Sequence, residues 1–338
     1  MKVGMFVMHM ADALVAPAVA GTMYAVSTAA AAYSVKKVRL ENEPKKIPAM
    51  GVMGAFVFAA QMINFTIPGT GSSGHLCGGM LLTAMLGPWA GFLTMIGILL
   101  IQCLVFADGG LLALGCNIWN MAFYGCFVGG LLIWKPFMKQ GMTKKKIAAA
   151  SVVACVITLQ MGAFSVTLQT LASGITELPF SVFVGAMQPI HLAIGLVEGL
   201  VTAAVLMFVY EARPEMLWEG DTVKKEGRFS FRKTLVILTA AAAFIAGVVS
   251  LFASALPDGL EWSMEQTAGT AELAASGGAY ETAESIQSAM AFLPDYAFSF
   301  SDSAVGTTVS GLVGGVLVIA LCAAVCYGFK FFRKGKKG

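Results

Sequence analysis

Charged residues are scarce in this chain, and their scarcity argues against a soluble fold. Only 12% of the 338 residues are charged, whereas 57% are hydrophobic and the mean hydropathy is +0.78. Soluble globular domains carry about 25% charged residues. We therefore expect an integral membrane protein.

Motifs for catalysis and nucleotide binding are also missing. The sequence contains no GxxxxGK[ST] phosphate loop and no HExxH zinc motif. Its seven cysteines form no CxxC pair and nearly all lie inside apolar runs, so they are expected to be small buried hydrophobic residues. The sequence therefore predicts neither an enzyme nor a bound cofactor nor a disulfide framework.

Long apolar runs dominate the chain and predict an all-α integral membrane protein. A helix needs about 20 residues to cross about 30 Å of hydrocarbon, and several runs reach that length. The period-two alternation that a transmembrane barrel requires is absent. The expected membrane-spanning segments are residues 14–35, 47–67, three within 76–134 of which the first is short or partly re-entrant, 147–171, 181–210, 234–255 and 304–329.

Basic residues give these segments an orientation. They are concentrated in residues 36–46, 135–146, 213–233 and 330–337, and short loops rich in Lys and Arg stay in the cytoplasm. A count of about nine transmembrane helices places every one of these basic segments on the cytoplasmic side. The N-terminus is then outside and the C-terminus cytoplasmic.

The charged segment 213–233 divides the chain into two expected modules. Residues 1–212 form a seven-helix core, 213–233 a cytoplasmic linker, and 234–338 a two-helix hairpin with an external loop at 256–303. That loop contains eight acidic residues and no Lys or Arg. Its two ends carry the triplets Leu256–Asp258 and Leu293–Asp295, which are typical of turns.

Histidine occurs three times, and two of these residues lie in polar segments on the expected external side. His9 is near the N-terminus, and His75 follows a Gly/Ser-rich stretch. Two imidazoles in one pocket suit nickel, copper, cobalt or zinc, whereas calcium and magnesium prefer oxygen ligands. Asp12 and Asn64 are candidates to accept hydrogen bonds from the imidazoles. An incidental structural role for both histidines is the alternative.

Met8 adds a ligand if it is the first residue of the mature protein. Its α-amine, together with the amide nitrogen and Nδ1 of His9, would close two chelate rings in one plane and leave one corner for His75. Such an all-nitrogen plane favours Ni(II) or Cu(II). If Met1 is the first residue, the amine is unavailable.

Five further polar residues lie inside the apolar regions. His191 and Glu198 are seven residues apart, near the same helical face, and are interpreted as a buried pair or a contact to another subunit. Asp108, Asn117 and Asn120 on the fifth expected span are interpreted as helix–helix hydrogen-bonding residues.

Several motifs in order resemble the CbiM/NikM family, the metal-specificity components of cobalt and nickel energy-coupling-factor transporters. The segment Pro257–Glu261 resembles the companion NikN-type component, so the chain looks like a fused protein of the nickel type. The first resemblance is carried by Met8–Asp12, Asn64-Phe65 with Pro68-Gly69, Ser73–Leu76, Gly87–Trp89, Phe106–Leu111, Asn117–Asn120, and His191 with Glu198-Gly199.

The resemblance implies a metal site formed by Met8, His9 and His75, with Ni(II) as the transported ion and Co(II), for cobalamin synthesis, as the alternative. It also implies a transmembrane coupling protein of the NikQ/CbiQ type, two cytoplasmic ATPase subunits of the NikO/CbiO type, and a bacterial or archaeal cell membrane. Asp12 departs from the family pattern because Ala13, not Gly, follows it.

Residues 1–7 are a second departure, because they would block the amine of Met8. Either translation starts at Met8 or these residues are removed. A stand-alone channel or secondary transporter is the main rival, but the inverted repeat that would support it is not found in the sequence. A membrane anchor or assembly subunit is the second rival.

Overall fold

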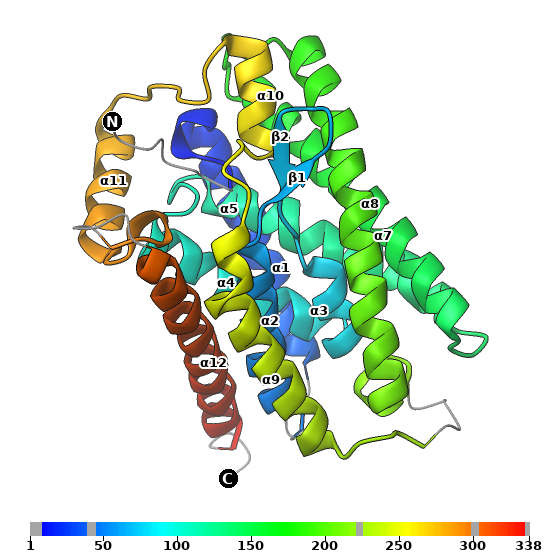
Figure 1. The fold of residues 1–338 in the computed structure, drawn as a ribbon. Helices are drawn as coiled ribbons and strands as arrows, with labels where there is room; N and C mark the ends of the chain where they lie inside the picture. Colours follow the sequence, from blue (N-terminus) through cyan, green and yellow to red (C-terminus); the bar gives the residue numbers. More distant parts are fainter. Residues whose placement is uncertain (1–8, 39–44, 221–225, 299–303, 335–338) are drawn as a thin grey trace.

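The computed structural model is a helical bundle with one small hairpin at one end (Figure 1). It describes residues 9–38, 45–220, 226–298 and 304–334. Met8, the expected third ligand residue, lies outside these ranges. The N-terminal part of the bundle contains η1 (Asp12–Leu14), α1 (Pro17–Lys37), α2 (Lys46–Gln61), α3 (Gly79–Leu86), α4 (Pro88–Phe106), α5 (Leu114–Asn117), η2 (Ile118–Trp134), α6 (Lys135–Met138), α7 (Lys144–Ala172) and α8 (Phe180–Ala212).

The C-terminal part begins after η3 (Pro214–Met216) and holds two long helices with shorter ones between them. We call residues 231–334 the C-terminal module. Its elements are α9 (Phe231–Gly247), η5 (Val249–Phe252), α10 (Gly259–Ala268), α11 (Gly278–Met290), η6 (Pro294–Tyr296) and α12 (Ala304–Lys334). The expected external loop thus contains two helices, α10 and α11.

Membrane-spanning character is clear for most of the long helices. Among the described residues, six helical stretches are long and apolar enough to cross a bilayer, and α2 is a shorter apolar helix. This confirms an all-α membrane fold. Each expected span falls on a helix, although α3 has only eight residues. The total of nine crossings stays a prediction.

The second expected span ends earlier than its apolar run suggested. Residues 47–67 were expected to be helical, but α2 ends at Gln61, and β1 (Phe65–Ile67) pairs antiparallel with β2 (Ser72–Gly74). Ile67 precedes Pro68, and a residue before proline is pushed toward extended backbone. The Gly/Ser-rich loop is therefore a hairpin that leads directly to His75.

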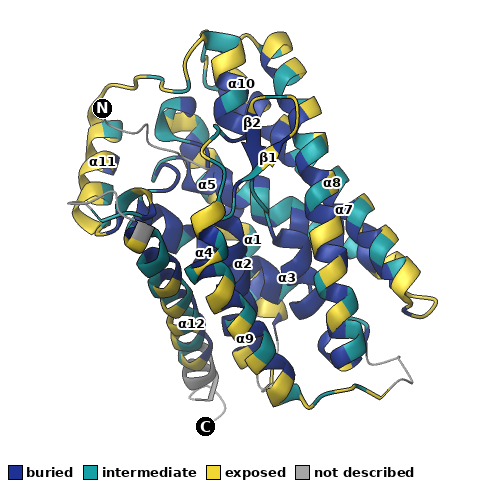
Figure 2. Cartoon of the chain, viewed as in Figure 1, coloured by how far each residue is buried: buried dark blue, intermediate teal, exposed yellow. Residues whose placement is uncertain are grey.

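Helix α2 is the centre of the hydrophobic core. Nearly all its residues are buried, and it packs against α4, α9 and α12 (Figures 1 and 2). A Cβ on Gly54 would lie 2.7 Å from Val318 Cγ1 of α12, and one on Gly51 would lie 3.5 Å from Ile319 Cγ2. The C-terminal module therefore completes the core of the N-terminal part.

The two ends of the bundle differ in what they carry. The hairpin β1–β2, α10 and α11 lie at one end in Figure 1, whereas α9 begins at the other end, next to the linker. This separation matches the expectation that the acidic segment and the basic linker lie on opposite sides of the membrane. Which side is cytoplasmic stays a prediction.

Candidate metal site

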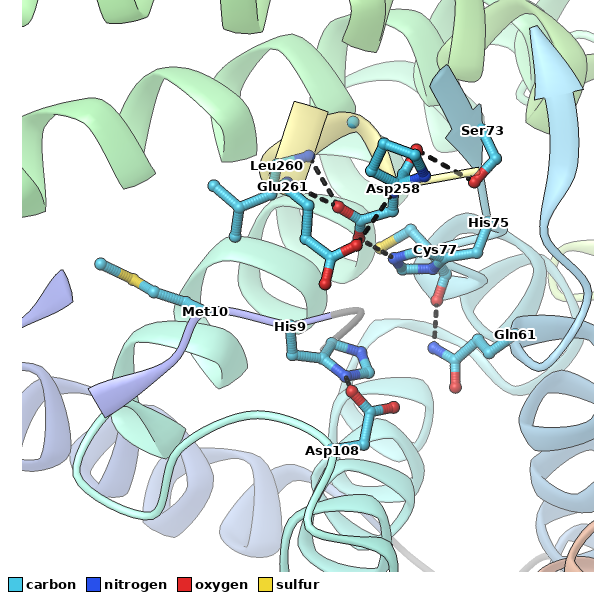
Figure 3. A network of polar contacts seen from close by, with 12 residues as sticks. His9, Met10, Gln61, Ser73, His75, Cys77, Asp108, Asp258, Leu260 and Glu261 are labelled. Carbon is cyan, nitrogen blue, oxygen red and sulfur yellow. Dashed lines mark hydrogen bonds and ion pairs between the residues drawn. The ribbon is translucent and has the colours of Figure 1, made fainter. Parts of the chain in front are cut away.

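His9 and His75 meet in the structure, although 66 positions separate them in the sequence. Their ring centroids are 5.6 Å apart with an angle of 63° between the planes. His9 lies in the segment before η1, and His75 directly follows β2. Only 4% of His9 is exposed, and the His75 side chain is 14% exposed. The two rings therefore lie close together, as the topology predicted (Figure 3), and a shared ligand stays a prediction.

The His9 imidazole is held at one nitrogen and unpartnered at the other. Nδ1 lies 2.8 Å from Oδ1 of Asp108, and Nε2 is buried without a partner among the described residues. Because a buried polar atom without a partner is costly, Nε2 is the atom to which a ligand would bind in this arrangement. The expected chelate through Nδ1 requires the contact with Asp108 to break.

Asp108 differs from its expected place and role. It lies in the loop after α4, not on the fifth span, and contacts His9 instead of a neighbouring helix. Desolvation favours the neutral carboxyl, but the charge interaction and hydrogen bond with His9 outweigh it and lower the pKa of Asp108.

His75 has a carboxylate neighbour that we did not select from the sequence. Its Nε2 lies 3.6 Å from Oδ2 of Asp258, and its Nδ1 lies 3.3 Å from the carbonyl oxygen of Leu76. Burial opposes protonation of His75, but the polar and charge interactions with the Asp258 carboxylate outweigh it and raise the pKa of His75 to about 9. In the sequence, Asp258 stood out only as the last residue of the turn triplet Leu256–Asp258.

Glu198 anchors the His75 segment and does not pair with His191, so the expected His–Glu pair is wrong. Its Oε2 and Oε1 accept hydrogen bonds from the backbone nitrogens of Cys77 and Gly78, both at 2.9 Å. His191 Nδ1 instead lies 2.8 Å from the carbonyl oxygen of Met187 in its own helix. Helical spacing placed these two residues near one face but did not reveal the loop that packs against Glu198.

Asn117 holds the backbone next to His9. Its Oδ1 accepts from the Met10 nitrogen at 3.0 Å, and its Nδ2 donates to the Met10 oxygen at 3.1 Å. Asn120 forms two hydrogen bonds with Gln169 of α7, at 2.8 and 3.0 Å. The helix–helix role is therefore confirmed for Asn120, whereas Asn117 positions the N-terminal segment.

Asp12 and Asn64 do not contact the imidazoles, contrary to expectation. Asp12 Oδ1 accepts from the backbone nitrogen of Ala113 at 2.9 Å, and burial raises the pKa of this carboxyl. The carbonyl oxygen of Asn64 accepts from the backbone nitrogen of Ser254 at 2.7 Å. Asp12 and Asn64 therefore hold backbone segments near the site, and other residues orient the imidazole rings.

A cavity of about 100 Å³ opens beside the two histidines. Its lining comes from η2, α7, α8 and the start of α10 and includes Cys77, Asn120, His191 and Asp258. In the described part of the chain, no group of three or more His, Cys, Asp or Glu side chains could hold a metal ion. An ion bound by His9 and His75 therefore needs donors of another kind, such as backbone or amine nitrogens.

Comparison with known families accounts for nearly the whole chain. The family model described as "Cobalt uptake substrate-specific transmembrane region" matches residues 9–216, and the "PDGLE domain" model matches residues 232–331. An Archaeoglobus fulgidus protein, provisionally named as a fused nickel transport protein NikMN, is 34% identical over 93% of this chain and 96% of its own length.

Two further relatives and one crystal structure carry metal-transport names. The fused nickel transport protein NikMN of Rhodobacter capsulatus is 28% identical over 93% of this chain and 95% of its own. The cobalt transport protein CbiM of Sorangium cellulosum is 31% identical over 53% of this chain and 80% of its own. A truncated transition metal transporter superposes with a TM-score of 0.53 at 29% identity, covering 60% of this chain and 99% of that one.

Proposed function

Because the chain belongs to the family of cobalt uptake substrate-specific transmembrane regions, we propose that it is the metal-binding component of an ATP-driven importer of the energy-coupling-factor type. It takes up Ni(II) from the external face and delivers it across the membrane. One observation carries the proposal. The ring centroids of the buried His9 and the mostly buried His75 lie 5.6 Å apart in an edge-on arrangement, and His9 Nε2 has no partner among the described residues.

The proposed ligands are Met8, His9 and His75. The two histidines supply imidazole nitrogens, and a free α-amine on Met8 adds a donor that is not a His, Cys, Asp or Glu side chain. The described residues around the cavity supply too few such side chains to complete a site, which supports a donor of this kind. Nitrogen donors in one plane favour Ni(II) over Zn(II).

Cobalt is the second candidate ion, and the name of the matching family model favours it. Two observations favour nickel: the PDGLE match at residues 232–331, and two relatives named for nickel transport that align over 93% of this chain. The proposed nitrogen donors favour it as well. We therefore place Ni(II) first and Co(II) second.

The proposed partners are a transmembrane coupling protein of the NikQ/CbiQ type and two cytoplasmic ATPase subunits of the NikO/CbiO type. The sequence has no phosphate loop of its own, which is consistent with ATP hydrolysis by other chains. The proposed orientation has the His75 end of the bundle outside and the basic linker in the cytoplasm, because short Lys- and Arg-rich loops stay inside.

Calorimetric titration of the purified full-length protein with Ni(II), Co(II) and Zn(II) tests this function. We expect Ni(II) to bind most tightly and His75→Ala to lose most of that affinity. A control, Lys144→Ala, removes an exposed ion pair with Glu211 at the far end of the bundle and leaves affinity unchanged. Equal nickel binding by wild type and His75→Ala defeats the proposal.

Visible absorption of the nickel-loaded protein tests the ligand plane. A chain that begins at Met8 is expected to show the spectrum of square-planar Ni(II), because its amine is free and the ion replaces Asp108 at Nδ1 of His9. A chain that retains residues 1–7 is expected to bind nickel more weakly and with a different spectrum. Octahedral Ni(II) in the chain that begins at Met8 contradicts the planar site.

A further inference from the structure

The C-terminal module reaches both histidines of the candidate site. Asp258 Oδ2 lies 3.6 Å from His75 Nε2, and the Tyr296 hydroxyl donates a 2.6 Å hydrogen bond to Asp108, the residue that contacts His9. From this geometry we infer that the C-terminal module supplies the groups that position both metal-binding imidazoles. The inference rests on the proposed function and assigns a task to the module within it.

Asp258 is fixed by the start of α10. Its Oδ1 accepts from the backbone nitrogens of Leu260 and Glu261 at 2.8 and 2.9 Å, and its own backbone nitrogen donates to Glu261 Oε2 at 3.3 Å. This reciprocal arrangement is a capping box. Because Oδ1 is committed to the helix, Oδ2 is directed at His75 (Figure 3).

The backbone before α10 is tied to the hairpin that carries His75. Ser73 of β2 donates its backbone N–H to the oxygen of Pro257 at 2.7 Å and its hydroxyl to the oxygen of Leu256 at 2.8 Å. His75 is the first residue after β2, and Asp258 is the first residue after Pro257. The bonds between the two segments therefore hold the Asp258 carboxylate near the His75 ring.

Tyr296 acts on His9 through Asp108. It is 7% exposed, and its ring stacks on Phe106 with centroids 4.7 Å apart. Asp108 uses both carboxylate oxygens, because Oδ2 accepts from Tyr296 while Oδ1 lies 2.8 Å from His9 Nδ1. The orientation of the Asp108 carboxylate, and with it that of the His9 ring, therefore depends on the Tyr296 hydroxyl.

Gln287 of α11 adds a second tie to the Asp108 loop. Its Nε2 donates to the carbonyl oxygens of Gly109 at 2.7 Å and Cys103 at 2.9 Å. The module thus holds both the side chain of Asp108 and the backbone next to it.

Each imidazole consequently has a carboxylate beside one ring nitrogen. Such a carboxylate fixes the ring orientation before an ion binds. The planar chelate then requires His9 Nδ1 to exchange Asp108 for the ion. In both cases the C-terminal module places the carboxylate, directly with Asp258 and through a hydroxyl with Asp108. The turn triplets Leu256–Asp258 and Leu293–Asp295 thus help to place these carboxylates. Asp258 is the last residue of the first triplet, and Tyr296 directly follows the second.

Two conservative substitutions in the full-length protein test the inference. Tyr296→Phe keeps the stacked ring but removes the hydroxyl. Asp258→Asn keeps a helix-capping oxygen but removes the charge beside His75. Groups that orient metal-binding imidazoles change affinity by about 10- to 100-fold when mutated, so each variant is expected to bind Ni(II) at least about tenfold more weakly and to shift the visible absorption of bound Ni(II).

Tyr280→Phe is the matched control. Tyr280 lies in the same module, and its hydroxyl donates to the oxygen of Val15 at 2.9 Å, away from both histidines. This variant removes one interface hydroxyl just as Tyr296→Phe does, so it should bind nickel like wild type. Its melting temperature gives the loss of stability to be compared with that of the Tyr296 variant.

The possible outcomes separate the inference from the function. Failure of the wild-type protein to bind Ni(II) defeats the proposed function itself. Wild-type binding with unchanged affinity and unchanged absorption in Tyr296→Phe overturns the inference for His9, and the same result in Asp258→Asn overturns it for His75. Weaker binding and a shifted spectrum in both variants, with Tyr280→Phe unchanged, support it. A fall in affinity without a spectral shift, matched by a lower melting temperature, indicates general destabilisation and also overturns it.

Discussion

The backbone nitrogen of Cys77 donates a 2.9 Å hydrogen bond to Oε2 of Glu198, although 121 positions separate the two residues. Glu198 is 1% exposed, and its other oxygen accepts from Gly78. A buried carboxylate is costly unless it is well hydrogen-bonded, so α8 and the start of α3 depend on each other. His75 lies two residues before Cys77 and takes its position from this anchor.

Glu198→Gln should loosen the anchor. A glutamine amide cannot accept both backbone hydrogen bonds as a carboxylate does, and hydrogen bonds to charged groups contribute about 1.5–3 kcal/mol. We expect a lower melting temperature and weaker Ni(II) binding, measured by thermal unfolding and calorimetry in detergent. Glu211→Gln is the control, since it changes an exposed carboxylate paired with Lys144. A Glu198→Gln protein with wild-type melting and affinity would show that the anchor is dispensable.

Asn117→Ala should release the backbone next to His9. Its side chain makes both a donor and an acceptor contact with Met10. The substitution leaves the buried Met10 nitrogen without this partner at a cost of about 1–3 kcal/mol, whereas the Met10 oxygen still accepts from the Gly110 nitrogen. The expected result is weaker nickel binding together with lower thermal stability. Asn120→Ala is the comparison, because it breaks the pair with Gln169 and should lower stability with a smaller effect on affinity. The same affinity loss in both variants would contradict a specific role for Asn117.

Gly109→Ala should displace His9 from its described position, because the added methyl group would clash with the His9 side chain. A Cβ at this position would lie 2.7 Å from the His9 Cβ and 3.0 Å from Asn117 Nδ2, and the backbone φ is +80°. Gly141→Ala provides the control, because its φ is +91° and a Cβ there meets nothing within 4 Å. Both variants carry the cost of a left-handed backbone, but only Gly109→Ala is expected to lose nickel binding by calorimetry. Retained affinity in Gly109→Ala would rule out the described position of His9 in the metal-bound protein.

His191→Gln should leave nickel affinity near that of wild type. His191 lines the cavity, but its Nδ1 is bound to the carbonyl oxygen of Met187, and we assign it no ligand role. The same substitution at His75 should abolish tight binding, so the pair of variants forms a matched comparison in one titration. A comparable loss in both would make His191 a ligand.

The sequence predicted the helices and the meeting of His9 with His75 for physical reasons that the structure makes clear. Apolar runs long enough to span a bilayer leave little choice but a helix, and rare imidazoles in two polar segments on one side were expected to converge. The structure places the rings 5.6 Å apart. Their role as metal ligands stays a prediction, and so does that of Met8, which lies outside the described residues.

Long-range partners could not be predicted in the same way. Helical periodicity showed that His191 and Glu198 lie near one face, but it contains no information about a distant loop that packs there, and Glu198 in fact holds Cys77. Asp258 and Tyr296 follow the histidines by far more than a hundred residues, and only the folded chain brings them to His75 and Asp108.

The burial of α2 between early and late segments of the chain has a consequence for biosynthesis. The ribosome completes α2 long before it makes α9 and α12, the helices that cover much of its surface. Gly51 and Gly54, which later fit against Ile319 and Val318, must therefore face lipid or provisional neighbours during insertion. The native surroundings of α2 form only after the last helix has entered the membrane, so a chain truncated before α12 leaves the insertion machinery with an incompletely packed helix.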